Sequence, residues 1–232
     1  MTASWVSIAG SKGEQFDAYL SLPPTGRGPG LVVIQEIFGV NAHIRAVADQ
    51  YAADGYTVMA PDIFWRHERR IALGYDQPGF DKGLALLGSL DLDASAGDLK
   101  ACVDALRANP ACTGSVGSLG FCMGGLLSYV AAAHAGVDTA VCYYGGGIHQ
   151  QLDRASHIRC PILFHFAEQD GYIPASAVEA VQQRMKSHAR AQIVVHPGVD
   201  HGFNCWQRPS WHQVTAARAR GQSLVHLSET LS

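Results

Sequence analysis

The feature that most constrains the fold is the stretch at positions 116–125, Val-Gly-Ser-Leu-Gly-Phe-Cys-Met-Gly-Gly. Its apolar start is followed by Gly120-Phe-Cys-Met-Gly124 and then by a helix-like run at 126–135. A strand that turns sharply into a helix, with a reactive side chain at the apex and glycines two positions away, is typical of a nucleophile elbow, which usually carries serine. Larger side chains at those glycines would collide with the neighbouring strand and helix. The pattern favours Cys122 as a nucleophile; the alternative is a structural turn with a buried cysteine.

The rest of the chain alternates between strand-like and helix-like segments from residue 31 onward. Such alternation predicts an α/β fold with a mainly parallel central sheet and helices on both faces. Residues 5–9 and 16–22 are expected to form an antiparallel pair of strands at one edge, and residues 64–78 a loop over the site. The further strands are expected at 31–34, 56–60, 116–119, 139–144, 161–167 and 192–196, and the helices at about 41–53, 81–90, 93–107, 126–135, 175–188 and 211–231.

Length and composition narrow the class of protein. The 232 residues show no repeat or linker, which predicts a single α/β domain over 1–232. A formal net charge of −3 argues against nucleic-acid binding, and no apolar run approaches the roughly 20 residues of a membrane span. The N-terminus lacks a basic region followed by an apolar one, so we expect no signal peptide and a cytoplasmic protein. The histidines and cysteines form no HxH, HExxH or CxxC motif, so neither a metal nor another cofactor is expected.

Polar residues that follow the predicted strands are the candidates for a site, because ligands of parallel sheets bind at the carboxyl ends of the strands. These residues are Glu36, Cys122, Tyr143, Asp170 and His201. The order cysteine, aspartate, histidine matches the nucleophile, acid and base of α/β-hydrolases. A thiol needs a base to become a strong nucleophile, and the base needs an acid to orient it.

Each candidate also has a structural interpretation. Asp170 precedes Gly171 and is a plausible turn residue, and Glu168 competes with it for the role of the acid. His201 could be a surface-loop histidine. Glu36 follows a buried strand, where a carboxylate needs a partner or a raised pKa.

Several segments together resemble the dienelactone hydrolase (carboxymethylenebutenolidase) family of α/β-hydrolases. The resemblance runs from about residue 28 to the C-terminus. The matching segments are Gln35-Glu-Ile-Phe-Gly-Val-Asn41, Ala60-Pro-Asp62, Gly120-Phe-Cys-Met-Gly-Gly125, Tyr143-Tyr-Gly145, Gln169-Asp170 followed by Ile173-Pro174, and His201-Gly-Phe203.

The resemblance implies a role for each matching position. Cys122 would be the nucleophile, His201 the base and Asp170 the orienting acid, while Glu36 would contact the resting thiol and help to generate the thiolate. The expected chemistry is attack on an ester or lactone carbonyl, followed by hydrolysis of a thioester acyl-enzyme.

The resemblance also implies the surroundings of the nucleophile. The backbone N–H groups of Ile37 and Met123 would form the oxyanion hole, where loss of one donor typically costs about 100-fold or more in rate. The side chains of Tyr143, Phe38 and Phe203 would line the substrate pocket.

The sequence departs from the family at the arginines that hold a substrate carboxylate. One family arginine corresponds to Cys205 here, and the other falls near Phe80 or Asp81. Gly202 also replaces a small hydroxyl residue. The arginines that could substitute from another direction are Arg66, Arg69, Arg70 and Arg208. Without one of them, a neutral or aromatic ester fits better than a carboxylate-bearing dienelactone.

Three functions therefore remain open. The first is a cysteine hydrolase of small esters or lactones, acting as a monomer or small homo-oligomer. The second keeps the same Cys122, His201 and Asp170 site but acts as a promiscuous esterase or phosphotriesterase on neutral aromatic substrates. The third is a non-enzymatic redox sensor that uses the Cys122 thiol.

Overall fold

The strands of the computed structural model, which describes residues 2–10 and 13–231, form an eight-stranded sheet in the order β1-β2-β4-β3-β5-β6-β7-β8. The pairs β1–β2 and β2–β4 are antiparallel, and all the other neighbouring strands are parallel. The predicted antiparallel edge pair is therefore confirmed. The strands are β1 (Ala3–Ala9), β2 (Gln15–Ser21), β3 (Gly28–Ile34), β4 (Thr57–Pro61), β5 (Cys112–Phe121), β6 (Thr139–Tyr143), β7 (Ile162–Ala167) and β8 (Ala191–His196).

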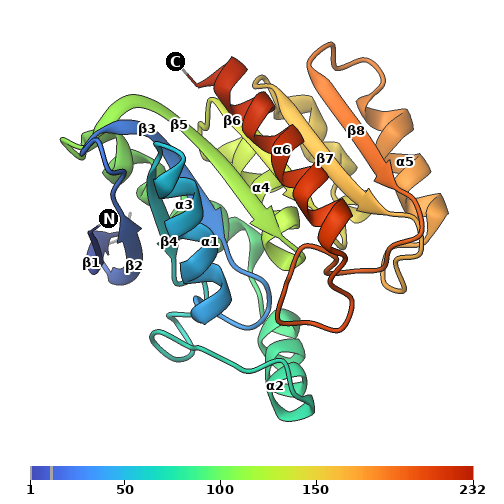
Figure 1. Cartoon of the computed structure of the whole chain (residues 1–232), viewed down its shortest axis with the longest axis horizontal. Helices are drawn as coiled ribbons and strands as arrows, with labels where there is room; N and C mark the ends of the chain where they lie inside the picture. Colours follow the sequence, from blue (N-terminus) through green and yellow to red (C-terminus); the bar gives the residue numbers. More distant parts are fainter. Residues whose placement is uncertain (1, 11–12, 232) are drawn as a thin grey trace.

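Helices cover both faces of this sheet. In Figure 1, α1 and α6 cross in front of the sheet and α4 lies behind it. Strands β4, β6 and β7 are buried along their whole length, as expected where helices pack on both sides. The predicted α/β architecture is confirmed. The helices are α1 (Ala42–Ala53), α2 (Gln77–Gly88), α3 (Leu92–Ala108), α4 (Met123–His134), α5 (Ala175–Met185) and α6 (Gln213–Thr230), with short 3₁₀ helices at Ile148–Gln150 and Leu152–His157.

Helix α2 begins four residues earlier than the sequence predicted. Asp76 caps it, because its carboxylate accepts a hydrogen bond of 3.0 Å from the Gly79 N–H, and Pro78 lies in the first turn. An acidic cap followed by an early proline is a helix-start signal. The polar and aromatic residues before it had suggested a longer loop.

The carboxyl ends of the parallel strands open toward one edge of the molecule. Figure 1 shows α2 and the loop between β8 and α6 at that edge, beyond the tips of β3 and β5. Among the described residues, no helix combines the length and the apolarity needed to cross a bilayer.

Candidate active site

Cys122 occupies a strained turn between β5 and α4. Its backbone has φ 55° and ψ −118°, and such a conformation costs a non-glycine residue on the order of 1–3 kcal/mol. The surrounding backbone is tight: a Cβ on Gly120 would lie 1.9 Å from the Gly124 carbonyl oxygen, and one on Gly124 would lie 2.3 Å from the Ile34 carbonyl oxygen. Only glycine fits at either position. The sequence therefore folds into the elbow that its glycines predicted.

Asp170 and His201 follow β7 and β8 and meet beside Cys122. The His201 Nδ1 and the Asp170 Oδ2 are 2.8 Å apart, and both side chains are buried. The other carboxylate oxygen of Asp170 accepts hydrogen bonds from the N–H groups of Tyr172 and Ile173, at 2.9 and 3.1 Å. Asp170 is thus both a turn residue and the partner of His201. The carboxylate of Glu168, the competing candidate, accepts a hydrogen bond from the Gly198 N–H, whereas the His201 ring pairs with Asp170.

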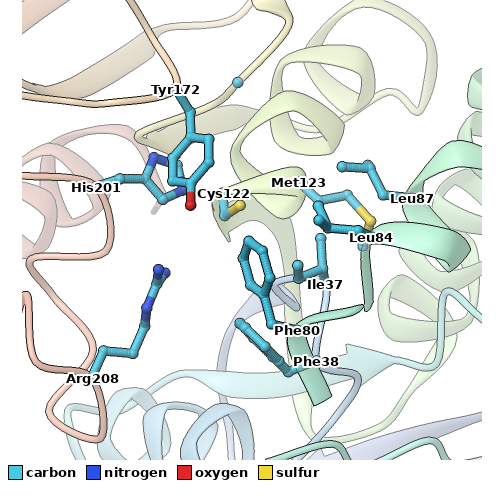
Figure 2. Close-up of a pocket in the computed structure, with 11 residues that line it drawn as sticks. Ile37, Phe38, Phe80, Leu84, Leu87, Cys122, Met123, Tyr172, His201 and Arg208 are labelled. Carbon is cyan, nitrogen blue, oxygen red and sulfur yellow. The ribbon is translucent and has the colours of Figure 1, made fainter. Parts of the chain in front are cut away.

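His201 carries a raised pKa. Burial alone would lower it, but the charge of the Cys122 sulfur, hydrogen bonds to Asp170 and Cys122, and the charge of Asp170 together raise the pKa of His201 to about 10. An imidazole with that pKa keeps its second proton at neutral pH. Figure 2 shows the ring directed toward Cys122. A positively charged ring therefore lies beside Cys122.

Glu36 lies two residues after the end of β3 and is buried. Its Oε2 accepts a hydrogen bond of 3.1 Å from the Tyr75 hydroxyl, and its Oε1 accepts one of 3.4 Å from the Arg208 guanidinium. Burial raises the pKa of Glu36, and the positive charge of Arg208 opposes that shift. The side chain thus has the charged partner that its burial requires. Neither bond is to Cys122, so the contact with the resting thiol stays a prediction.

Ile37 and Met123 border the same space as Cys122. Both residues line the cavity above Cys122. Met123 is the first residue of α4, where an N–H has no acceptor within the helix and the helix dipole favours negative charge. The two predicted oxyanion donors therefore both border the cavity above Cys122, one from the loop after β3 and one from the elbow.

The cavity above Cys122 has a volume of about 130 Å³ and mostly apolar walls. Helix α2 forms one wall, which Figure 2 shows opposite His201 and Tyr172. Phe38 lies at the cavity, as predicted. The lining residues are Ile37, Phe38, Phe80, Leu84, Leu87, Cys122, Met123, Gly146, Tyr172, His201 and Arg208.

Tyr143 and Phe203 require a correction, because neither side chain lines this cavity. The Tyr143 hydroxyl is 2.6 Å from the Ser223 Oγ on α6, and both aromatic side chains are almost completely buried. Side chains alternate between the two faces of a strand, and Tyr143 points to the α6 face. Tyr144, the next residue, instead has its ring 5.0 Å from that of His201.

Of the four arginines considered as substitutes, Arg208 lines the cavity. Figure 2 shows its guanidinium directed toward the space that Cys122 and His201 border. Arg66 pairs with Asp98 on α3, and Arg69 and Arg70 pair with Asp17, so none of these three lines the cavity. Arg208 lies seven positions after His201, on the loop before α6, so motif spacing did not single it out.

Sequence reasoning missed four residues of the site. Leu84 and Leu87 share a helix face with Phe80, at a spacing that would have marked an apolar face of α2 had the helix start been recognised. Tyr172 lies two residues after Asp170. Tyr75 binds Glu36 from an irregular loop, and no sequence signal indicates that contact.

Comparison with known proteins shows the family to which the chain belongs. Residues 16–230 match the model of the dienelactone hydrolase family. The carboxymethylenebutenolidase of Pseudomonas putida is 32% identical over 229 residues, covering 98% of this chain and 97% of that protein. A putative carboxymethylenebutenolidase of Azospirillum brasilense is 36% identical over 201 residues, covering 85% of this chain and 86% of that protein.

Solved structures give the same result. The crystal structure of a putative dienelactone hydrolase from Klebsiella pneumoniae matches with a TM-score of 0.87 and 28% identity, covering 98% of each chain. The dienelactone hydrolase-like promiscuous phosphotriesterase P91, from metagenomic libraries, shares the fold with a TM-score of 0.81 and 22% identity, and each chain is fully covered. The match over nearly the whole chain and the arrangement around Cys122 lead to one conclusion: this chain belongs to the dienelactone hydrolase family of hydrolytic enzymes.

Proposed function

We propose that this enzyme hydrolyses small carboxylic esters or lactones through a covalent thioester on Cys122. The observation that carries the proposal is the hydrogen-bonded pair of His201 and Asp170 beside a cysteine at a strained strand-to-helix turn. A nucleophile, a base within reach and an acid that orients the base form the arrangement that acyl transfer needs.

In the proposed reaction the Cys122 sulfur attacks the substrate carbonyl carbon, and the carbonyl oxygen becomes an oxyanion. The Ile37 and Met123 N–H groups donate hydrogen bonds to that oxyanion. The tetrahedral intermediate collapses as the C–O bond to the leaving group breaks, and protonated His201 donates its proton to the departing alkoxide. Neutral His201 then removes a proton from water, and the resulting hydroxide attacks the thioester, which releases the acid and regenerates the thiolate.

The walls of the cavity support a substrate with a small apolar body. Phe38, Phe80 and Leu84 offer apolar surface on the side opposite His201. Arg208 adds one positive charge within the same cavity, which favours a carboxylate on the substrate. A small ester or lactone that carries a carboxylate therefore fits better than the missing arginine positions alone had suggested.

A second candidate is hydrolysis of neutral aromatic phosphotriesters at the same site. The apolar and aromatic walls favour it, and P91, which has this fold, is described as a promiscuous phosphotriesterase. A panel of a carboxylate-bearing lactone, a neutral aryl ester and an aryl phosphotriester, compared by kcat/KM, separates the two candidates. Preference for the phosphotriester over both carbonyl substrates would reverse their order.

The nucleophile is tested by replacing it. Cys122→Ala should lower kcat for an activated aryl ester by at least about 1,000-fold, and His201→Ala should cause a similar loss. Cys160→Ala is the matched control, because that buried thiol precedes β7 at the opposite end of the sheet and should leave kcat unchanged. Mass spectrometry of the wild type with a slow ester should detect an acyl adduct on Cys122. Full activity of a folded Cys122→Ala variant would contradict the mechanism.

A further inference from the structure

A second cluster of reactive side chains does not line the cavity and plays no part in the proposed reaction as a group. It comprises Glu36, His43 and Cys205, all three buried. One potential ligand atom from each residue lies within 4.8 Å of the other two. The three side chains come from separate segments: the loop after β3, the first turn of α1 and the loop before α6. Their wide separation in sequence explains why no metal motif was apparent.

The environment of the His43 ring is the observation that points to a ligand. Its ring is fully buried, and neither ring nitrogen has a hydrogen-bond partner among the described residues. Buried polar groups in native proteins are nearly always paired, and leaving one unpaired costs about 1–3 kcal/mol. The ring packs 4.1 Å from that of Trp206 and 6.3 Å from that of Tyr75, which hold it in place. A rigid, unpaired imidazole is therefore directed at a carboxylate and a thiol.

We propose that Glu36, His43 and Cys205 bind a zinc ion. Carboxylate, imidazole and thiolate are the three ligand types of zinc sites, and three protein ligands leave a fourth tetrahedral position for water. A point equidistant from three atoms spaced at 4.8 Å lies about 2.8 Å from each, so shifts of less than about 1 Å reach the zinc bond lengths of about 2.0–2.3 Å. Tyr75, which donates to Glu36, supplies the outer hydrogen bond that orients a ligand.

Zinc binding releases one proton from the protein and leaves the three-ligand site without net charge. A cysteine binds zinc as the thiolate, so the Cys205 thiol proton leaves to solvent as the S–Zn bond forms. Zinc with one carboxylate and one thiolate is then neutral. Arg208 loses its ion pair with Glu36 and keeps its charge at the edge of the substrate cavity. The zinc site thus competes with Arg208 for Glu36.

The experiment measures metal binding directly and does not depend on the proposed hydrolysis. Cys122→Ala is the parent protein, because it removes the other thiol that could bind zinc together with a histidine. It should bind one zinc ion per chain in competition with a chromogenic chelator under phosphine reductant. With cobalt it should develop a thiolate-to-metal charge-transfer absorption.

Two ligand variants and one control are made in that parent. His43→Phe keeps an aromatic ring against Trp206, and Cys205→Ala removes the thiol; each should weaken zinc binding by more than about tenfold, and Cys205→Ala should abolish the charge-transfer band. Cys102→Ala, which removes another fully buried thiol, should change neither readout. Thermal unfolding confirms that each variant is folded.

Two results would overturn the proposal. One is the absence of stoichiometric zinc binding by the Cys122→Ala parent. The other is binding that survives both His43→Phe and Cys205→Ala, which would place the metal elsewhere.

Discussion

Gly202 has a left-handed backbone with φ +81°, and its Cα faces the guanidinium of Arg208. A Cβ at this position would lie 2.5 Å from the Arg208 Nη1 and 2.8 Å from its Cζ. The absence of a side chain at Gly202 therefore gives Arg208 the room to reach the cavity. Gly202 and Arg208 are therefore two parts of one local arrangement.

From the close packing of Gly202 and Arg208 we predict an effect on substrate preference. Gly202→Ala should displace Arg208 and lower kcat/KM for a carboxylate-bearing ester by about 10- to 100-fold, the effect of losing one charge-assisted hydrogen bond. A neutral ester of the same size should be affected much less. The measurement is the ratio of the two kcat/KM values.

Gly198 provides the control for backbone strain. It also has positive φ, +69°, but nothing lies within 4 Å of the Cβ that alanine would add. Gly198→Ala should leave the ratio unchanged. Equal effects of the two substitutions would show that strain, and not the position of Arg208, sets the preference.

At the scale of elements, α2 contacts the oxyanion region through a residue without a side chain. A Cβ on Gly83 would lie 2.8 Å from the carbonyl oxygen of Ile37 and 3.0 Å from its Cγ1. The helix therefore packs directly on the residue whose N–H is the proposed oxyanion donor. The position of α2 and the geometry of that donor are linked.

We accordingly expect Gly83→Ala to lower kcat for an aryl ester by about tenfold, a part of the 100-fold cost of losing a donor outright. The added methyl group must push α2 or Ile37 aside. Gly88→Ala, at the end of the same helix, has no atom within 4 Å of its new Cβ and should leave kcat unchanged. A fall in kcat for Gly88→Ala alone would refute this explanation.

A buried polar network connects the sheet to α6. His165 Nε2 lies 3.1 Å from the Ser223 Oγ, and His165 Nδ1 lies 3.0 Å from His196 Nε2. Burial, together with the charges of His196 and His226, lowers the pKa of His165 to about 3. The folded protein therefore holds His165 neutral in a pH range in which the unfolded chain protonates it.

The sign of the resulting pH dependence follows from proton uptake. Below about pH 6.5 the unfolded state binds a proton that the folded state excludes, so the free energy of unfolding falls as pH drops from 6.5 toward 3. His165 contributes a slope of about 1.4 kcal/mol per pH unit. Urea unfolding at pH 7 and pH 5 should show the loss. His165→Gln should reduce the slope, and the exposed His67→Gln should not; an unchanged slope in His165→Gln would contradict the assignment.

The sequence predicted the parts of the fold that depend on local pattern. Buried strands, the glycines around Cys122 and the residues directly after strands all follow from short-range chemistry, and the structure brings Cys122, Asp170 and His201 together. Two kinds of feature escaped. Tyr143 was expected to line the pocket but points toward α6, because a position at the end of a strand does not fix which face of the sheet its side chain takes. Arg208 and Tyr75 lie on irregular loops, whose paths depend on tertiary packing.

The placement of α2 separates the residues that shape the substrate cavity from the residues proposed to perform the reaction. The groups proposed to perform the chemistry follow β3, β5, β7 and β8, whereas much of the apolar wall comes from a helix that stands beyond the edge of the sheet. The residues of α2 that face the cavity can therefore be exchanged without altering the strands that hold Cys122, provided that glycine remains at position 83. Substitutions on α2 can therefore change which substrates fit the cavity while the reaction itself stays the same.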